Sequence, residues 1–328
     1  MKKIFCFVIV LFLAGIVISC KKDSNESKEV QIFTSSEDFR IEHFQKRLNE
    51  QFPQYKIIIN YMTTGSLAAK LKAEGTETDC DIIGELDSAY LEGILNNLAD
   101  LSSYDSSVFL DELVPDHHKY LPFIKSAGCI IINEQFMADR KLPIPTSYQD
   151  LIKPIYKGVI SMPNPKSSGT GYFFLKNLVN VWGEDAAFAY FDKFADNVLQ
   201  FTSSGSGPVN ALIQGEAGIG LGMTFQAVTV INSKGVPLKI VYFKEGSPYT
   251  VYGTAMIKGK DSNKAVQDVF KFFVTVIIRE DKELFVPEQI FKNQVNNIPN
   301  YPQNVIAADM RGIESLPEKE RLLAKWKY

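Results

Sequence analysis

The feature that most limits the folds open to this chain is a recurring order of strand, hydroxyl-rich turn and helix. Apolar and β-branched runs at residues 30–34, 56–61 and 79–83 predict three strands. The first two strands each run into a Ser/Thr/Gly turn, and helical spacing follows at 39–52 and 67–74. A strand–turn–helix order that repeats in this way predicts βαβ units and parallel sheets, so we expect an α/β fold.

The same order returns in a second set. A strand at 159–162 leads into the turn NPKSSGTG at 164–171, and Phe201–Gly222 holds another hydroxyl-rich turn, a helix and a Gly-rich strand. We therefore expect two lobes, from a first set at about 30–120 and a second at about 125–250. Ligands of such sheets bind beyond the carboxyl ends of the strands. The candidate ligand-binding residues there are Ser35, Ser36, Thr64, Gly65, Ser66, Glu85, Ser168, Gly169, Thr170, Ser204, Gly205, Ser206 and Thr224.

Four of these turns are suited to an anion. They are Ser35-Ser36, Thr64-Gly65-Ser66, Ser168-Gly169-Thr170 and Ser204-Gly205-Ser206. Each precedes a predicted helix, whose first turn offers unpaired N–H groups and the positive end of the helix dipole. The alternative is an ordinary capped helix after each turn. A nucleotide P-loop is excluded at Phe201–Gly222, because no Lys follows the glycines.

The first twenty residues predict an exported, lipid-anchored protein. A Lys-Lys start, an apolar run over 4–18 and a closing Ser-Cys pair indicate a secretory signal peptide at 1–19. The end Val-Ile-Ser-Cys resembles a bacterial lipobox, so lipidation is expected at Cys20, with 20–29 as a polar tether. We therefore expect a protein of the periplasm or cell envelope that its N-terminal lipid holds to a membrane. The alternative is an uncleaved anchor.

Composition excludes several other classes of function. Removing 1–19 takes two of 35 basic residues and none of 38 acidic ones, so the formal charge moves from −3 to −5. The chain has no long basic run, and nucleic acid is not an expected partner. With three histidines, no CxxC and no HExxH, we expect no metal and no cofactor. Cys80 and Cys129 lie in apolar stretches, and the sequence leaves open whether they pair or stay buried thiols.

Several stretches, in their order and spacing, resemble the solute-binding proteins of bacterial ABC importers with the type II periplasmic fold. They include TTGSLAAKLKAE at 63–74, PTSYQDLIKPIYKGVISMPNPKSSGTG at 145–171 and SSGSGPVNALIQGEAGIGLG at 203–222. The resemblance covers nearly all of 30–328, and it is to the branch of ferric-iron, hexose-phosphate, polyamine and aminophosphonate binders. It implies two α/β lobes, each a mostly parallel sheet flanked by helices. Two crossing strands would join the lobes, which close on a ligand.

The resemblance also implies domain boundaries and partners. Residues 30–125 plus about 256–328 would form lobe 1, and 126–255 would form lobe 2. The crossing strands would lie near Ser126–Ile130 and near Val251–Ala255. The implied partners are a small anionic solute, the permease and ATPase subunits of the importer and, through the lipid, a membrane. The protein itself is expected to be a monomer.

The resemblance leaves several ligands open. Iron binders of this branch carry adjacent tyrosines that ligate the metal, whereas this chain has no Tyr-Tyr pair and holds Ser, Thr and Gly at the corresponding 202–207. A ferric ion requires hard anionic oxygens, and N–H and hydroxyl donors suit an oxyanion better. We therefore expect a sugar phosphate or related phosphate ester, with Glu85 holding sugar hydroxyls. Ferric iron, polyamines and aminophosphonates are the alternatives.

Two other classes of function compete with solute binding. A transferase or phosphatase with a serine nucleophile would need a base beside the serine. None of the four turns contains a histidine, and no GxSxG motif occurs, so we expect no enzymatic activity. A structural or adhesive lipoprotein is the remaining alternative, and it would have no occupied cleft.

Overall fold

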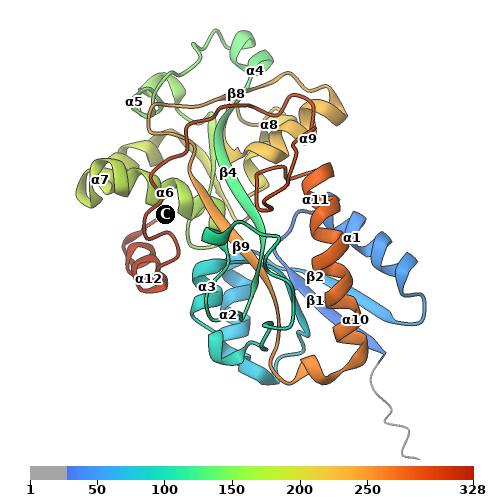
Figure 1. Cartoon of the computed structure of the whole chain (residues 1–328). Coiled ribbons are helices and arrows are strands. Elements are labelled where there is room, and N and C mark those ends of the chain that lie inside the picture. Colours follow the sequence, from blue (N-terminus) through green and yellow to red (C-terminus); the bar gives the residue numbers. More distant parts are fainter. Residues whose placement is uncertain (1–27) are drawn as a thin grey trace, which may run out of the picture.

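The computed structural model describes residues 28–328, which form two α/β lobes (Figure 1). This is the architecture that the sequence predicts, so the predicted fold class is confirmed. The signal peptide at 1–19 and the lipidation site Cys20 lie outside the described residues. Within 28–328, no helix has both the length and the apolar character that crossing a bilayer requires.

The first lobe is built on three parallel strands. The strand β1 pairs in parallel with β2 on one side and with β3 on the other, and β9 and the first half of β4 extend this sheet in antiparallel pairing. The elements of this lobe are β1 (Glu29–Thr34), α1 (Asp38–Gln51), β2 (Lys56–Tyr61), α2 (Thr64–Glu74), β3 (Ile82–Asp87), α3 (Ser88–Glu92), β4 (Leu121–Asn133), β9 (Tyr249–Met256), α10 (Lys264–Phe272) and α11 (Ile278–Leu284).

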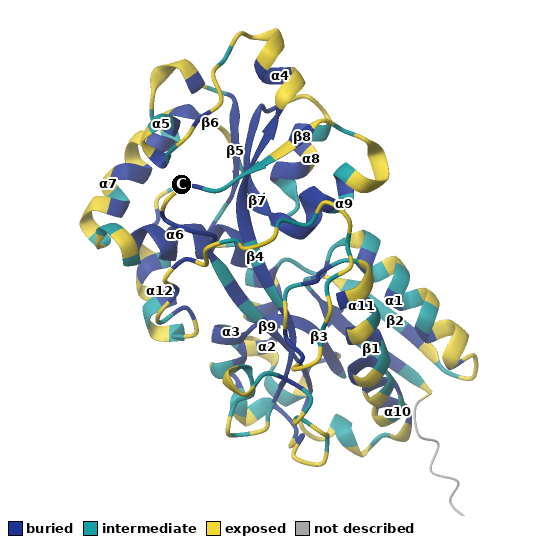
Figure 2. Ribbon diagram, turned by 45° about the horizontal axis from the view of Figure 1, so that its top comes forward, coloured by how far each residue is buried: buried dark blue, intermediate teal, exposed yellow. Residues whose placement is uncertain are grey.

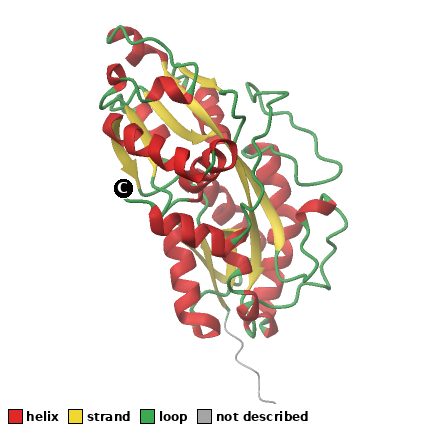
Figure 3. Ribbon diagram, turned by 90° about the vertical axis from the view of Figure 1, so that its left-hand side faces the viewer, coloured by secondary structure: helices red, strands yellow, loops and turns green. Residues whose placement is uncertain are grey.

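The second lobe repeats this plan. The strand β5 pairs in parallel with β6 and β7, and the second half of β4 pairs in antiparallel fashion with β7 and β8. Its elements are α4 (Glu134–Asp139), α5 (Tyr148–Leu151), β5 (Ile160–Pro163), α6 (Gly169–Trp182), α7 (Glu184–Phe194), β6 (Val198–Thr202), α8 (Gly207–Ile213), β7 (Ile219–Met223), α9 (Thr224–Lys234) and β8 (Leu238–Val241). In a side view, helices lie on both faces of the strands (Figure 3).

The two sheets meet in β4. Ala127 is the last residue of β4 that pairs with β9, and Gly128 is the first that pairs with β7, so the first crossing falls within the predicted stretch. The second crossing lies a few residues earlier than predicted, because β9 belongs to the first-lobe sheet from Tyr249 onward. At the change of partner, the Gly128 N–H donates to the Pro248 carbonyl at 2.7 Å, which joins both crossing strands.

Each lobe has its own buried core (Figure 2). Cys80 lies in the first-lobe core and Cys129 in the second, and both are buried, free thiols. Burial raises the pKa of Cys129 to about 12. The two cysteines therefore do not pair, which settles the alternative that the sequence left open.

The C-terminal segment crosses from one lobe to the other, which differs from the expectation that all of 256–328 belongs to lobe 1. Val286 and Ile290 pack in the first-lobe core. The last helix, α12 (Leu316–Lys325), and the residues around it pack in the second-lobe core instead. The physical reason is apolar burial: Leu322 and Trp326 are almost fully buried there, with the Trp326 ring 5.1 Å from that of Phe191.

Candidate functional site

A cavity of about 460 Å³ lies between the lobes. The first lobe contributes Ser35, Glu37, Asp38, Phe39, Glu42 and Tyr61 to its wall, and the second lobe contributes Ser204, Gly205, Ser206, Asn210 and Gln226. Pockets of this size, with a few polar groups from two domains, are typical of small-molecule sites. Four of the predicted residues, Ser35 and Ser204 to Ser206, therefore face one cavity from opposite lobes.

The second-lobe wall is the turn between β6 and α8. The hydroxyls of Ser204 and Ser206 lie 3.0 Å apart. A side chain on Gly205 would place its Cβ 2.5 Å from the Thr170 hydroxyl oxygen, so this turn can pack against α6 only with glycine. Gln226, on α9, donates from Nε2 to the Ser206 carbonyl at 3.3 Å and supports the turn from behind.

The first-lobe wall is the turn that leads from β1 into α1. Ser35 is held there by β3, because both its N–H and its hydroxyl donate to the Glu85 carbonyl at 3.1 Å. Glu37 is the N-cap residue of α1, and Asp38 and Glu42 follow on the first turns of that helix. This end of the helix therefore presents carboxylates to the cavity as well as hydroxyl groups.

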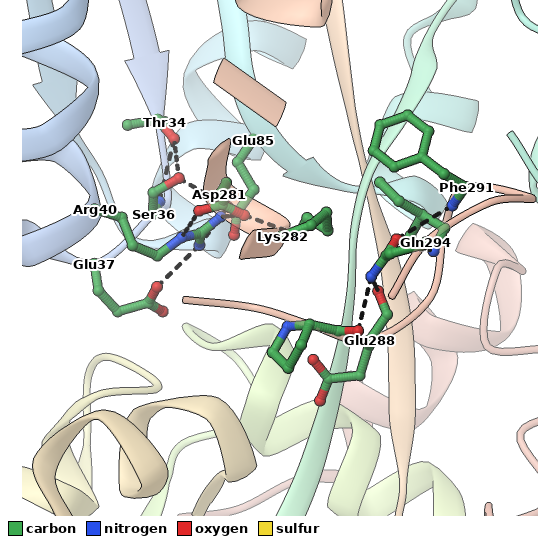
Figure 4. A network of polar contacts seen from close by, with 12 residues as sticks. Thr34, Ser36, Glu37, Arg40, Glu85, Asp281, Lys282, Glu288, Phe291 and Gln294 are labelled. Atoms are coloured by element: carbon green, nitrogen blue, oxygen red, sulfur yellow. Dashed lines mark hydrogen bonds and ion pairs between the residues drawn. The ribbon is translucent and has the colours of Figure 1, made fainter. Parts of the chain in front are cut away.

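A buried ionic cluster lies behind this wall (Figure 4). The Arg40 guanidinium is fully buried and donates to Glu37 at 3.0 Å, to Glu85 at 2.7 Å and to both oxygens of Asp281 at 2.7 and 3.1 Å. Its other side lies over aromatic rings, including Phe225 of the second lobe at 5.6 Å. The cluster is thus built within the first lobe and covered by the second.

The charges in this cluster shift one another's pKa values. Burial raises the pKa of Glu37 to about 7, and the charge of Glu85 acts in the same direction while Arg40 opposes it. Burial would also raise the pKa of Asp281, but the positive charges of Arg40 and Lys282 outweigh that effect and hold it below its usual value. Lys282 lies 2.8 Å from Asp281 and is itself buried.

Two predicted residues belong to this cluster rather than to the cavity wall. Glu85 accepts from Arg40 and from the Ser36 hydroxyl, both at 2.7 Å, and the Ser36 hydroxyl also lies 2.8 Å from that of Thr34. A carboxylate used in this way does not line the cavity. The expectation that Glu85 holds sugar hydroxyls therefore does not fit this geometry, and Glu85 instead positions Arg40.

Two of the predicted turns meet each other across the cleft. The Gly65 N–H donates to the Ser167 carbonyl at 3.1 Å, and a Cβ on Gly65 would lie 2.6 Å from the Lys166 carbonyl oxygen. Thr64 is buried beside this contact, and Ser66 is exposed, with its N–H donating to the Thr63 hydroxyl at 3.4 Å. These residues close the cleft beside the cavity rather than line it.

The turn before α6 is also committed to protein contacts. The Ser168 hydroxyl caps the helix by accepting from the Gly171 N–H at 3.4 Å. Gly169 lies so close to the Tyr252 hydroxyl that a side chain would collide with it. Thr170 packs against Gly205 at the edge of the cavity. Of this turn, only Thr170 comes close to the cavity wall.

Thr224 is separated from the other predicted residues. It begins α9, and its hydroxyl lies 3.3 Å from that of Tyr242. Both face a different, smaller cavity of about 170 Å³, with Glu288 and Tyr301 on its wall. Thr224 directly follows the strand β7, as the sequence indicates, but it lines this smaller cavity and not the larger one.

Sequence reasoning missed seven residues of the cavity: Glu37, Asp38, Phe39, Glu42, Tyr61, Asn210 and Gln226. Glu37 directly follows the predicted Ser35-Ser36 turn. The rule that ligands bind beyond the carboxyl ends of strands could therefore have predicted it. Asn210 and Gln226 lie on helices after the turns, and only helical spacing from the turn would have indicated them. Tyr61 is the last residue of β2, and the sequence prediction covered the turn after that strand but not the strand's own last residue.

A second buried ion pair joins the lobes beside the hinge. Lys319 of α12 lies 2.8 Å from Asp87 of β3, and both side chains are almost fully buried. Asp87 also accepts from the Ala89 N–H at 3.0 Å and from the Thr250 hydroxyl at 3.3 Å. Burial lowers the pKa of Lys319, and the Asp87 charge opposes this.

Two further ion pairs, one exposed and one partly buried, extend this link along α12. Glu320 pairs with Lys72 of the first lobe at 3.0 Å, whereas Glu318 pairs with Lys176 of the second at 2.8 Å. The helix therefore contacts both lobes at once, and its contacts depend on how the lobes are placed relative to each other.

Among residues 28–328, no group of three or more His, Cys, Asp or Glu side chains is arranged to hold a metal ion. The cavity wall offers isolated carboxylates, hydroxyl groups and amides. Such a wall can bind a polar organic molecule through hydrogen bonds from several directions.

Comparisons with known proteins give a consistent picture. A family model described as bacterial extracellular solute-binding protein matches residues 83–310. An uncharacterized protein of Haemophilus influenzae is 26% identical over 260 residues, which are 76% of this chain and 73% of that protein.

Solved structures show the same fold. The periplasmic binding protein AfuA from Actinobacillus pleuropneumoniae, with exogenous fructose-6-phosphate bound, is 22% identical with a TM-score of 0.81, over 92% of this chain and 98% of that one. Iron-bound HitA from Pseudomonas aeruginosa is 16% identical with a TM-score of 0.73, over 90% of this chain and 98% of that one. At these identities the likeness concerns the fold alone.

Proposed function

The chain belongs to the bacterial extracellular solute-binding protein family, and we propose that its ligand is a small phosphorylated organic solute, a sugar phosphate. As a member of this family with the type II fold, it is the solute-binding component of an ABC importer, whose permease and ATPase subunits are its partners. It captures the solute between its lobes and delivers it to the permease. Its role is binding and not catalysis.

The observation that supports a phosphate ester is the meeting of serine-rich turns from both lobes at one cavity. Ser35 comes from the first lobe, and Ser204 and Ser206 come from the second. Hydroxyl donors form charge-assisted hydrogen bonds with phosphate oxygens, and such bonds are worth roughly 1.5–3 kcal/mol each. The amides of Asn210 and Gln226 offer further partners for the hydroxyls of a sugar.

The solved structures with this fold include proteins of two ligand classes. AfuA, which has this fold, was solved with fructose-6-phosphate bound. Ferric iron is the second candidate, because HitA shares the fold and was solved with iron. The carboxylates of Glu37, Asp38 and Glu42 are the hard oxygen donors that would favour iron, but the described part of the chain does not group them for a metal.

Calorimetry with four probes tests this proposal. Glucose 6-phosphate, inorganic phosphate, an aminophosphonate and ferric citrate are titrated into the purified protein. We expect glucose 6-phosphate to bind, and Ser206→Ala to weaken that binding by about ten- to a hundredfold, since about 1.4 kcal/mol corresponds to a factor of ten. Ser233→Ala, at an exposed position of α9, is the matched control and should change nothing. Tight ferric binding without a response to either phosphate ester or phosphonate would replace this proposal with iron transport.

We further propose that the mature protein is a monomer, anchored to a membrane through a lipid on Cys20. The support is the Lys-Lys start, the apolar run and the Val-Ile-Ser-Cys end, all in residues outside the described range. A Cys20→Ala protein should move to the aqueous phase of a detergent extraction. Retention in the detergent phase would show that the anchor is something else.

A further inference from the structure

The first lobe presents two helices to the cleft, one from each face of its sheet. Phe44 of α1 packs in a core cluster with Ile32, whereas Leu67 of α2 packs in another cluster with Phe33. Successive residues of a strand point to opposite faces of a sheet, so α1 and α2 cover opposite faces. The cleft therefore has an α1 side and an α2 side.

The α1 side holds the larger cavity and opens to solvent. The start of α1 is part of the cavity wall, and three residues of that wall, Glu42, Tyr61 and Asn210, are exposed. Glu42 and Tyr61 belong to the first lobe and Asn210 to the second. Tyr61 also interacts with Ser204 of the second lobe through its side chain. On this side, the lobes therefore face each other across a cavity through exposed side chains.

On the α2 side, the lobes contact each other through backbone atoms. The Gly65 N–H, in the first turn of α2, donates to the Ser167 carbonyl at 3.1 Å. The second lobe holds the Ser167 residue in place, because the Ser167 N–H donates to the Asn164 carbonyl at 3.1 Å and the Asn164 N–H to the Thr202 carbonyl at 2.8 Å. An N–H group that a helix leaves unpaired in its first turn is thus satisfied by the other lobe.

Position 65 requires glycine because of this contact. Gly65 does not have a positive φ, so other residues can adopt its backbone conformation, and alanine favours a helix more than glycine does. A Cβ at this position, however, would lie 2.6 Å from the Lys166 carbonyl oxygen and 3.2 Å from the Ser167 Cα, both backbone atoms of the second lobe. The glycine is therefore explained by the close approach of the two lobes and not by the helix that contains it.

The C-terminal helix joins the lobes on the same side. Lys72 of α2 pairs with Glu320 of α12 at 3.0 Å. Gly65 and Leu323 line one groove of about 310 Å³ between these two helices. The backbone contact at Gly65 and the packing of α12 therefore act on the same side of the cleft.

We propose that the lobes stay joined on the α2 side when no ligand is bound, and that the cleft opens and closes on the α1 side. The contact at Gly65 is made by protein atoms alone, so it favours the joined arrangement in the ligand-free protein as well. The ligand then enters and leaves past Tyr61 and Asn210. This inference goes beyond the proposed function, because it applies to any solute.

Two distances, measured between spin labels in the ligand-free protein, test this proposal. The cysteine pair Lys72→Cys and Glu320→Cys reports the α2 side, and the pair Glu42→Cys and Asn210→Cys reports the α1 side. All four positions are exposed, and both native cysteines among residues 28–328 are buried. We expect a narrow distance distribution on the α2 side and a broad one on the α1 side. A distribution on the α2 side that is as broad as that on the α1 side would overturn the proposal.

Variants of Gly65 then test the cause. Gly65→Ala forces a methyl group against the second-lobe backbone, and such overpacking should lower the ratio of joined to separated molecules at least about fivefold. Gly65→Leu, with a larger side chain that also favours a helix, should broaden the α2-side distribution further. Ser66→Ala, which places alanine at the exposed next position, is the control and should change neither distance. A narrow α2-side distribution in both Gly65 variants would overturn the role of the contact.

The second-lobe half of the contact gives an independent variant. The Asn164 Oδ1 accepts from the Lys166 N–H at 3.0 Å, and its Nδ2 donates to the Tyr328 carbonyl at 2.9 Å. Asn164→Ala therefore loosens the turn that carries the Ser167 carbonyl, and it should also broaden the α2-side distribution. A change on the α1 side alone would contradict the proposal. None of these measurements uses a ligand, so a failure of the sugar phosphate to bind would not affect their outcome.

Discussion

The two buried ionic clusters that share strand β3 differ in what they hold together. Glu85 of β3 pairs with Arg40, and the further partners Glu37 and Asp281 are also in the first lobe. Asp87, two residues later on the same strand, pairs instead with a lysine of the C-terminal helix α12. That helix is docked on the second lobe through its apolar side chains.

The difference means that one cluster acts on the stability of the first lobe and the other on the closure of the two lobes. The Arg40 cluster can form whether the lobes are open or closed, because its carboxylates move with the arginine. The Asp87–Lys319 pair links the first lobe to a helix whose apolar side chains pack in the second-lobe core. Conformational equilibria of two-lobed proteins are biased by contacts that exist in only one state. We expect the second pair to be such a contact.

The largest effect should follow the loss of Arg40. Arg40→Met leaves Glu85 and Asp281 buried without their cation, and breaking a buried ion pair from one side typically costs about 3–5 kcal/mol. Denaturant unfolding should show this loss in the free energy of unfolding. Arg47→Met, on the same helix but about one third exposed, is the control and should cost about 1 kcal/mol or less. Equal losses for both variants would show that the cluster does not stabilise the first lobe.

A smaller effect, and one of a different kind, should follow Lys319→Met. Asp87 keeps two hydrogen-bond donors, so we expect a loss of about 2–3 kcal/mol. It should appear as opening, with a larger radius of gyration in solution scattering of the ligand-free protein. Combining it with Asp87→Asn should restore part of the loss, because no buried charge is then left alone. An unchanged radius of gyration in Lys319→Met would show that the pair is not a closure contact.

The pH dependence of stability should distinguish the cluster further. The pKa of Glu37 is about 7 in the folded protein, against 4.5 for an ordinary glutamate. The folded protein therefore binds this proton more tightly, and stability falls as the pH rises from about 4.5 to about 7. Glu37→Gln should remove on the order of 1 kcal/mol of that fall in denaturant unfolding at pH 5, 6 and 7.

Part of the slope should remain in that variant. Glu288 is buried, and burial raises its pKa to about 7 as well, so it contributes in the same direction. A pH profile that Glu37→Gln leaves unchanged would mean that Arg40 keeps Glu37 ionised throughout this range.

The smallest effect belongs to the exposed end of the α12 link. Lys72 and Glu320 are both more than half exposed, and surface pairs are worth about 0.2–1 kcal/mol. Lys72→Ala should therefore change the free energy of unfolding by less than about 0.5 kcal/mol, and added salt should reduce even that. A loss comparable with that of Lys319→Met would show that the exposed pairs, and not the buried one, hold the helix to the first lobe.

Much of this architecture could be predicted from the sequence because it follows from local patterns. Strands, turns and helices recur at short spacing, so the two α/β sets and the positions of Ser35 and Ser204 could be predicted. The role of Glu85 could not be predicted from the sequence. Its partner Arg40 lies 45 residues earlier, and Arg40 in turn depends on Asp281, 241 residues away. No local pattern carries such pairings.

The packing of the C-terminal helix could not be predicted from the sequence either. Its apolar spacing and Trp326 predict that one face is buried, but two cores of similar composition are available to it. The choice is made by shape, because the Trp326 ring packs against Phe191 and Phe201. The apolar spacing of one segment does not indicate which distant segment it fits by shape.

The docking of that helix gives the protein a built-in optical reporter. The chain has two tryptophans, Trp182 on α6 and Trp326 after α12, and both pack in the second-lobe core. Tryptophan emission therefore monitors the second lobe and the packing of the C-terminal helix, because the first lobe contains no tryptophan. Comparing tryptophan emission with far-UV circular dichroism during denaturation resolves whether the lobes melt together or in sequence.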